Sequence, residues 1–142
     1  MSEEPRSPAG KVDLSNEAVH WELGDSRSYG DYLQLAQLLG AQRPISDAHD
    51  ETMFIIVHHV SELWIKLFLH ELEFVRRCVM RDDLDPSFKA LQRITKLQAQ
   101  LFGVWEVLAT MTPSDYSGFR NLLGRSSGFQ SAQYRLLSLI HI

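Results

Sequence analysis

Apolar residues recur every three or four positions along most of the chain, starting near Tyr29. The first such segment ends at Gly40, a residue type that commonly terminates helices, and Asp31 is its expected cap. No segment shows the alternation of apolar and polar residues that is typical of a half-buried strand, and no hairpin dipeptide occurs. The pattern therefore predicts an all-α fold.

The most apolar segment predicts a long helix that is capped by Asp47 and ends near Arg81, where R-D-D-L-D-P interrupts the pattern. The first half of this helix contains M-F-I-I-V, which is apolar on every face and therefore predicts deep burial. This run, from Met53 to Val57, is the longest uninterrupted apolar stretch and is too short to cross a bilayer. We therefore expect no membrane partner.

Capping signals predict three further helices. A D-P dipeptide beginning at Asp85 supplies a cap followed by a proline in the first turn of a third helix. The sequence T-P-S-D, from Thr112 to Asp115, predicts a short fourth helix that stops at Gly124. A fifth helix is expected to begin near Phe129.

Composition narrows the class of protein. The chain has 142 residues, of which 44% are hydrophobic, and a formal net charge of −4 without any basic block, which argues against a nucleic-acid partner. Residues 1–20 are rich in Pro, Ser, Glu and Gly, so we expect a disordered tail there and a folded portion over 21–142. A single cysteine, Cys78, and the lack of a signal-peptide pattern predict a reducing, cytoplasmic location.

Two pairs of residues carry the candidate chemistry. Phe54 and His58 are four positions apart and share one helix face, as do Tyr116 and Arg120. If the two helices converge, they form an apolar pocket that suits a flat ligand with a carboxylate, which an arginine binds as a planar fork. Spacing alone favours a simpler alternative, in which Arg120 caps a helix end or pairs with Asp115. For His58 a core hydrogen bond remains an equal alternative.

Other chemistries receive little support. The H-x-x-E pairs at His59 and His70 reverse the Glu-x-x-His order of di-iron bundles, and no further ligands accompany them. One cysteine excludes the usual zinc spacings, and no strand precedes a Gly-rich phosphate loop. We therefore expect no metal ligands from the protein, and a non-enzymatic helical interaction module remains the alternative to an enzyme.

Four motifs resemble tryptophan 2,3-dioxygenases, namely Y-G-D-Y-L, F-I-I-V-H-H-V-S-E-L-W-I-K-L, Y-S-G-F-R and S-S-G-F-Q-S-A-Q-Y-R. They occur in order between Tyr29 and Arg135. The resemblance implies an all-helical homotetramer with haem b, whose iron carries the O2 chemistry. It also implies that L-tryptophan is oxidised at its indole ring to N-formyl-L-kynurenine, the first step of tryptophan catabolism by the kynurenine pathway.

The resemblance also implies residue roles. His58 would be the distal histidine that accepts a hydrogen bond from the indole N–H, and Arg120 would bind the carboxylate. The further substrate contacts that it implies are Phe54, Ile55, Ile56, Val57, Tyr116 and, in a neighbouring subunit's pocket, Tyr29, Tyr32 and Leu33. The implied haem contacts are Phe54, Trp105 and Ser127.

Two features depart from the family pattern. His59 follows His58 directly and is a second candidate imidazole, although S-E-L-W fixes the register on His58. Family members are longer than this chain, and none of its six histidines matches their proximal haem ligand. We therefore expect an N-terminal portion of the bundle, incomplete at its C-terminus, that binds haem weakly or not at all by itself.

Overall fold

The computed structural model describes residues 22–23 and 27–140. They form an all-α protein, as predicted, apart from one pair of two-residue strands. The chain divides into two compact units, residues 1–41 and 42–142. The predicted tail over 1–20 lies outside the described residues.

In the first unit, β1 (Glu22–Leu23) and β2 (Arg27–Ser28) pair antiparallel. They precede α1 (Tyr29–Leu33) and α2 (Leu35–Leu39). A single helix from Tyr29 to Gly40 was predicted, and this is wrong because Gln34 adopts a left-handed conformation, with φ of 52°, that ends α1.

The predicted cap of α1 is also wrong. The cap is Ser28, whose hydroxyl accepts a hydrogen bond from the Asp31 N–H at 3.1 Å and donates to the Asp31 carboxylate at 2.7 Å. Asp31 thus lies inside the first turn, where its negative charge suits the positive end of the helix.

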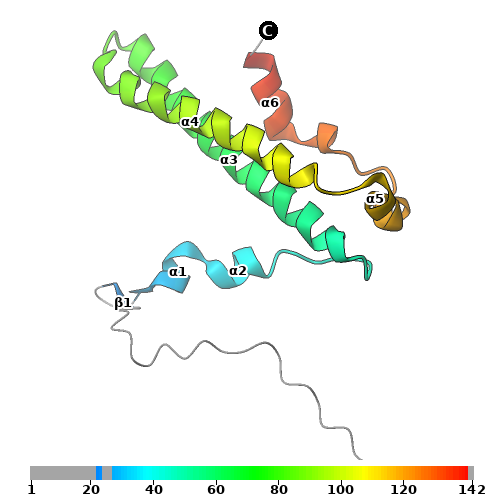
Figure 1. Cartoon of the computed structure of the whole chain (residues 1–142). Helices are drawn as coiled ribbons and strands as arrows, with labels where there is room; N and C mark the ends of the chain where they lie inside the picture. The colour runs from blue at the N-terminus through cyan, green and yellow to red at the C-terminus, as the bar shows by residue number, and fades with distance from the viewer. Residues whose placement is uncertain (1–21, 24–26, 141–142) are drawn as a thin grey trace, which may run out of the picture. The chain divides into compact units, whose positions relative to one another are not determined.

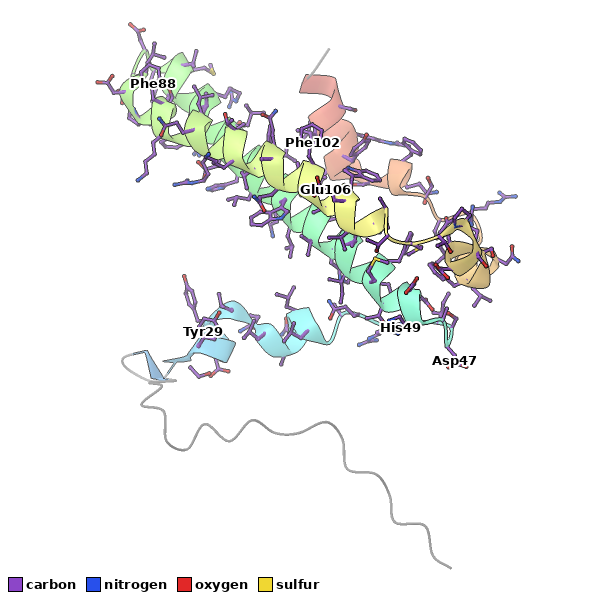
Figure 2. All side chains as sticks on the ribbon, viewed as in Figure 1. Tyr29, Asp47, His49, Phe88, Phe102 and Glu106 are labelled. Carbon is purple, nitrogen blue, oxygen red and sulfur yellow. The ribbon has the colours of Figure 1, made fainter. Side chains whose placement is uncertain are left out.

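The second unit is built on two long antiparallel helices, α3 (His49–Met80) and α4 (Asp85–Leu108), which lie side by side (Figure 1). A tight turn joins them, in which Asp82 has φ of 55°. A buried cluster of Phe68, Ile94 and Leu97 lies between them, and partly buried hydrophobic side chains pack against it. Figure 2 shows Phe88 at one end of this hairpin and Asp47 and His49 at the other.

Helix α3 ends one residue before the predicted position, but its predicted cap is wrong. Ala48 is the N-cap and makes no side-chain hydrogen bond. The backbone N–H groups of Ile45 and Ser46, just ahead of the helix, are instead bound by the carboxylate of Glu51. A similar one-residue shift occurs at α4, where Asp85 is the first helical residue and Leu84 is the N-cap.

Burial along α3 is lower than predicted. Of the M-F-I-I-V run only Val57 is buried, while Ile56 is exposed, because α3 is covered on only some of its faces by α4, α5 and α6. By length and composition alone, α3 as a whole could cross a membrane, which the uninterrupted run did not indicate. The core helix of a water-soluble protein can meet the same criterion.

The chain then forms α5 (Pro113–Arg120) and two 3₁₀ turns, η1 (Asn121–Leu123) and η2 (Gly128–Gln130). The prediction of a Thr112 cap is confirmed, and the helical path ends as predicted at Gly124, which has φ of 56°. The last element is α6 (Ala132–Ile140), and it lies beside α3. Gln133 fixes it there through a hydrogen bond of 2.6 Å to the Glu62 carboxylate.

Candidate functional site

A hollow of about 280 Å³ lies at the N-terminal end of α3. Its walls come from the segment preceding α3, from the first three turns of α3, and from η1. The lining residues are Arg43, Ile45, Glu51, Phe54, Ile55, His58, His59 and Leu123. The hollow thus combines an apolar wall with two imidazoles, which is the mixture expected of a small-molecule site.

The tautomer of His58 is set by its own helix. Its Nδ1 lies 2.7 Å from the carbonyl oxygen of Phe54, one turn earlier. Because a carbonyl can only accept, Nδ1 must carry the proton. In the neutral imidazole Nε2 is then a hydrogen-bond acceptor, and no described residue donates to it.

Helix α5 meets the start of α3 through a cluster of aromatic rings. The Phe54 ring centroid lies 4.2 Å from that of His58 and 5.8 Å from that of Tyr116. Phe119 completes the cluster, with centroid distances of 5.4 Å to Phe54 and 5.5 Å to Tyr116 in edge-to-face geometry. Phe119 has no exposed surface, so it anchors α5 against α3.

Sequence reasoning missed Phe119, although one signal was present. Phe119 follows Tyr116 by three positions, so the two share the helix face that was expected to meet α3. The structure confirms that these helices converge and that Phe54 lies between His58 and Tyr116. The hydrogen bond of His58 to a backbone carbonyl is also the simple core contact that was weighed as an alternative.

His59 has the opposite tautomer. The amide nitrogen of Gln42 lies 3.0 Å from its Nδ1. An amide NH2 can only donate, so Nδ1 accepts, and the ring proton of the neutral imidazole is on Nε2. Adjacent positions of α3 therefore present one imidazole acceptor, on His58, and one imidazole donor, on His59, along the same hollow.

The carboxylate of Glu51 fixes the segment that enters α3. It accepts hydrogen bonds of 2.8 Å from the N–H groups of both Ile45 and Ser46, and one from the Ser46 hydroxyl. These donors, first of all the Ile45 N–H, hold the pKa of Glu51 below its ordinary value of 4.5. Glu51 is only 2% exposed, and among the described residues its charge is satisfied by these donors and not by a cation.

The other predicted substrate residues on α3 and α5 lie in different surroundings. Ile55 lines the hollow, but Ile56 and Val57 do not. The guanidinium of Arg120 donates to the Gly124 carbonyl at 2.9 Å, which resembles the alternative of a helix-end cap. Asp115 does not pair with it, because its carboxylate accepts from the N–H and hydroxyl of Thr112.

The predicted haem contacts do not come together with Phe54 around this hollow. Trp105 is 63% exposed on α4, and Ser127 caps η2 by accepting from the Phe129 N–H. Neither lines the hollow. The described residues thus supply one wall suited to a flat ligand but not a complete haem site, and they contain no group of three or more potential metal ligands.

The remaining predicted contacts belong to the first unit. Tyr29, Tyr32 and Leu33 lie on α1 and are exposed there. Their expected role, implied by the family resemblance, is to contact the substrate in the pocket of a neighbouring subunit.

A second hollow, of about 450 Å³, lies at the opposite end of the α3–α4 hairpin. It is lined by Phe74, Asp85, Pro86, Lys89 and Ala90, together with an ion pair between Arg93 and Glu71. This hollow contains no imidazole, and two of its charged groups, Arg93 and Glu71, neutralise each other. It therefore offers less chemistry than the smaller one.

Comparison with known proteins decides the family. The model of the tryptophan 2,3-dioxygenase family matches residues 14–140, which include every described residue of the hollow. The chain belongs to the tryptophan 2,3-dioxygenase family. The resemblance found in the four motifs is thereby confirmed.

Individual relatives agree. The tryptophan 2,3-dioxygenase of Bradyrhizobium diazoefficiens is 49% identical over 128 residues, covering 90% of this chain and 46% of the relative. The enzyme of that name from Erythrobacter litoralis is 57% identical over 113 residues, covering 80% and 43% respectively. That of Bacillus thuringiensis is 47% identical over 124 residues, covering 87% and 44%. The chain thus spans a little under half the length of these relatives.

Proposed function

We propose that this chain forms the substrate-binding wall of a haem-dependent tryptophan 2,3-dioxygenase. The reaction would open the indole ring of L-tryptophan with O2 and give N-formyl-L-kynurenine, as the first step of tryptophan catabolism. Family membership supports the class of reaction.

One observation carries the assignment of the hollow as the indole site. The Phe54 carbonyl fixes the proton of His58 on Nδ1 and leaves Nε2 as an acceptor beside the Phe54 ring. An indole presents the complement of this pair, a flat apolar surface and one N–H donor. His58 would then position the substrate and tune the rate, without acting as an indispensable base.

The other contacts follow from the positions of α3 and α5. Phe54 would stack on the indole and Ile55 would contact its edge. Ile56 and Val57 would contact the substrate only with their backbone atoms. Tyr116, held against Phe54, would lie beside the amino-acid end of the substrate. Arg120 would bind the carboxylate, since its bond to Gly124 uses one of its five N–H donors.

Haem b would supply the activation of O2 when bound. The described residues would contribute only part of its site, and we assign no step to it. Trp105 and Ser127 would contact it in the assembled enzyme. Tyr29, Tyr32 and Leu33 would reach a neighbouring subunit of a cytoplasmic homotetramer.

The proposal is tested by ligand binding to the chain and to its His58→Ala variant. We expect the wild type to prefer L-tryptophan over N1-methyl-L-tryptophan, because methylation removes the N–H that His58 accepts. His58→Ala should reduce that preference by about three- to tenfold, the size of one neutral hydrogen bond. Calorimetric titration of both ligands measures it, and an unchanged preference would contradict the indole assignment.

A second experiment addresses the role of His58 in turnover. In the haem-loaded protein, His58→Ala should retain measurable turnover while its KM for tryptophan rises, because a positioning group is lost and not a base. Complete loss of turnover with the haem spectrum intact would show instead that His58 is indispensable.

A non-enzymatic interaction module remains the second candidate, since α4 exposes large apolar side chains such as Phe102 and Trp105. The titrations separate the two. A module that only docks through these side chains has no reason to distinguish tryptophan from its N1-methyl derivative.

A further inference from the structure

We propose that the hollow contains an anion subsite, formed by Arg43 and His59, that binds a carboxylate. The inference rests on the proposed function only for the identity of the ligand. The subsite itself follows from two hydrogen-bond donors that line the same hollow and have no acceptor among the described residues.

The first donor is Nε2–H of His59. Because Gln42 donates to Nδ1 at 3.0 Å, the ring proton of the neutral imidazole is held on Nε2, and the ring orientation is fixed by the same contact. No described residue accepts a hydrogen bond from Nε2. His59 is therefore a pre-oriented donor, unlike His58, which presents an acceptor.

The second donor is the guanidinium of Arg43, next in sequence to Gln42. It lines the hollow, and no described residue accepts a hydrogen bond from it or forms an ion pair with it. Gln42 lies against His59, so the segment that carries Arg43 is held beside that imidazole. A planar guanidinium is the side chain best suited to bind both oxygens of a carboxylate.

The one acid in the lining does not compete for this cation. Both oxygens of Glu51 are already occupied by Ile45 and Ser46, and the same bonds hold the segment 45–46 against α3. Glu51 is thus a positioning residue for the loop that carries Arg43. Among the described residues Arg43 forms no ion pair, so its guanidinium is left for a ligand.

The position of Arg120 makes a second carboxylate contact chemically useful. Its guanidinium is directed to the Gly124 carbonyl and does not line the hollow. A carboxylate near His58 would therefore meet Arg43 and His59 within the hollow itself. Such a carboxylate has two possible sources, the amino-acid substrate or the acidic side chains of a porphyrin.

The test compares the affinities of the 142-residue chain for paired probes that differ in the carboxylate. L-tryptophan is compared with tryptamine, and protoporphyrin IX with its dimethyl ester. The variants are Arg43→Gln, which removes the charge, and His59→Phe, which removes the donor but keeps a ring. His59→Gln restores a donor, and Arg125→Gln alters an arginine that does not line the hollow.

In at least one of the two pairs, we expect the wild type to bind the probe with the free carboxylate more tightly than its partner without one. Arg43→Gln and His59→Phe should each reduce that preference by about tenfold, the effect of one bond to a charged group, while His59→Gln and Arg125→Gln retain it. A reduction confined to the tryptophan pair identifies the substrate as the source, and one confined to the porphyrin pair identifies the cofactor.

The subsite is wrong if neither preference changes in Arg43→Gln and His59→Phe. It is equally wrong if the wild type does not discriminate within either pair, or binds no probe. Failure of the subsite remains distinct from failure of the proposed function. If tryptophan and tryptamine bind equally well and His58→Ala weakens both, the indole site stands and only the anion subsite is lost.

Discussion

At the scale of single residues, one helical turn determines what His58 can do. The carbonyl of Phe54 fixes the proton position of the imidazole, and the ring of Phe54 lies 4.2 Å from it. An acceptor held against a flat aromatic surface follows from two residues four positions apart on α3. Neighbouring His59 has the opposite tautomer, because the partner of its Nδ1 is a donor, the side-chain amide of Gln42, which lies outside the helix.

Glu51 gives a prediction for acid stability. Its hydrogen bonds lower its pKa in the folded state below the ordinary value of 4.5, so the unfolded chain binds this proton more tightly. Its stabilising contribution is therefore complete above that value and is lost as the pH falls through the lowered pKa. Glu51→Gln should be less stable at neutral pH and should lose less stability on acidification than the wild type.

Urea unfolding at several values between about pH 6 and about pH 3 measures this difference. Glu73→Gln provides the matched control. The pKa of Glu73 is also lowered, by its hydrogen bond with Arg76, but this pair lies on an exposed helix surface. If Glu51→Gln and the wild type lost stability in parallel over this range, the carboxylate would not hold the loop as described.

Sequence could predict the contacts within a helical turn but not those between segments. The shared face of Phe54 and His58 followed from their spacing, because i,i+4 geometry is the same in every α-helix. The tautomer of His59 depends on Gln42, 17 positions away, and no periodicity indicates that pairing. Arg43 was missed for the same reason, since its loop is placed by Glu51 and not by a helical pattern.

At the scale of elements, the short helix α5 depends on its first turn. Thr112 accepts from the Asp115 N–H, and the Asp115 carboxylate accepts from the Thr112 N–H, so that two backbone donors are satisfied reciprocally. The helix has only eight residues, which is too short for stability by propensity alone. Its cap and the burial of Phe119 therefore hold Tyr116 and Arg120 in place.

Thr112→Ala should consequently destabilise the chain by about 1 kcal/mol, the usual cost of losing such a cap. Urea unfolding followed by circular dichroism measures the loss. Ser114→Ala is the control, since that exposed residue lies in the same turn and its side chain makes no hydrogen bond in the structure. Equal effects of the two substitutions would show that the cap contributes nothing specific.

Element boundaries were predictable where the capping chemistry is local. Thr112 and Asp115 lie three positions apart and cap the helix as their sequence indicates. Asp47 failed as a cap because the helix begins at His49, so that Ala48 occupies the N-cap position. The break at Gln34 escaped prediction because an apolar stripe continues across it, and neither Gly nor Pro marks the left-handed residue.

At the scale of the whole molecule, the site depends on the α3–α4 hairpin, whose core is small. Phe68, with 3% of its surface exposed, packs with Ile94 and Leu97. Phe68→Ala should cost about 3–5 kcal/mol, which a chain of this size can hardly tolerate. Phe102→Ala, at a side chain that is 76% exposed on the same helix pair, should cost less than about 0.5 kcal/mol.

Thermal unfolding measures both variants. Similar melting temperatures for Phe68→Ala and Phe102→Ala would mean that the hairpin core does not hold the chain together.

The fold class could be predicted because helical periodicity extends over most of the chain. The extent of burial could not, since it depends on which faces of α3 are covered, and the apolar run at its start is covered only in part.

The protonation of His58 in the presence of ligand tests the proposed indole site most directly. Long-range ¹H–¹⁵N spectra of the labelled chain report which ring nitrogen carries the proton. We predict protonated Nδ1 and bare Nε2 in the free chain, and a shift of the Nε2 resonance with L-tryptophan but not with N1-methyl-L-tryptophan. A proton on Nε2, or equal shifts with both ligands, would contradict the account.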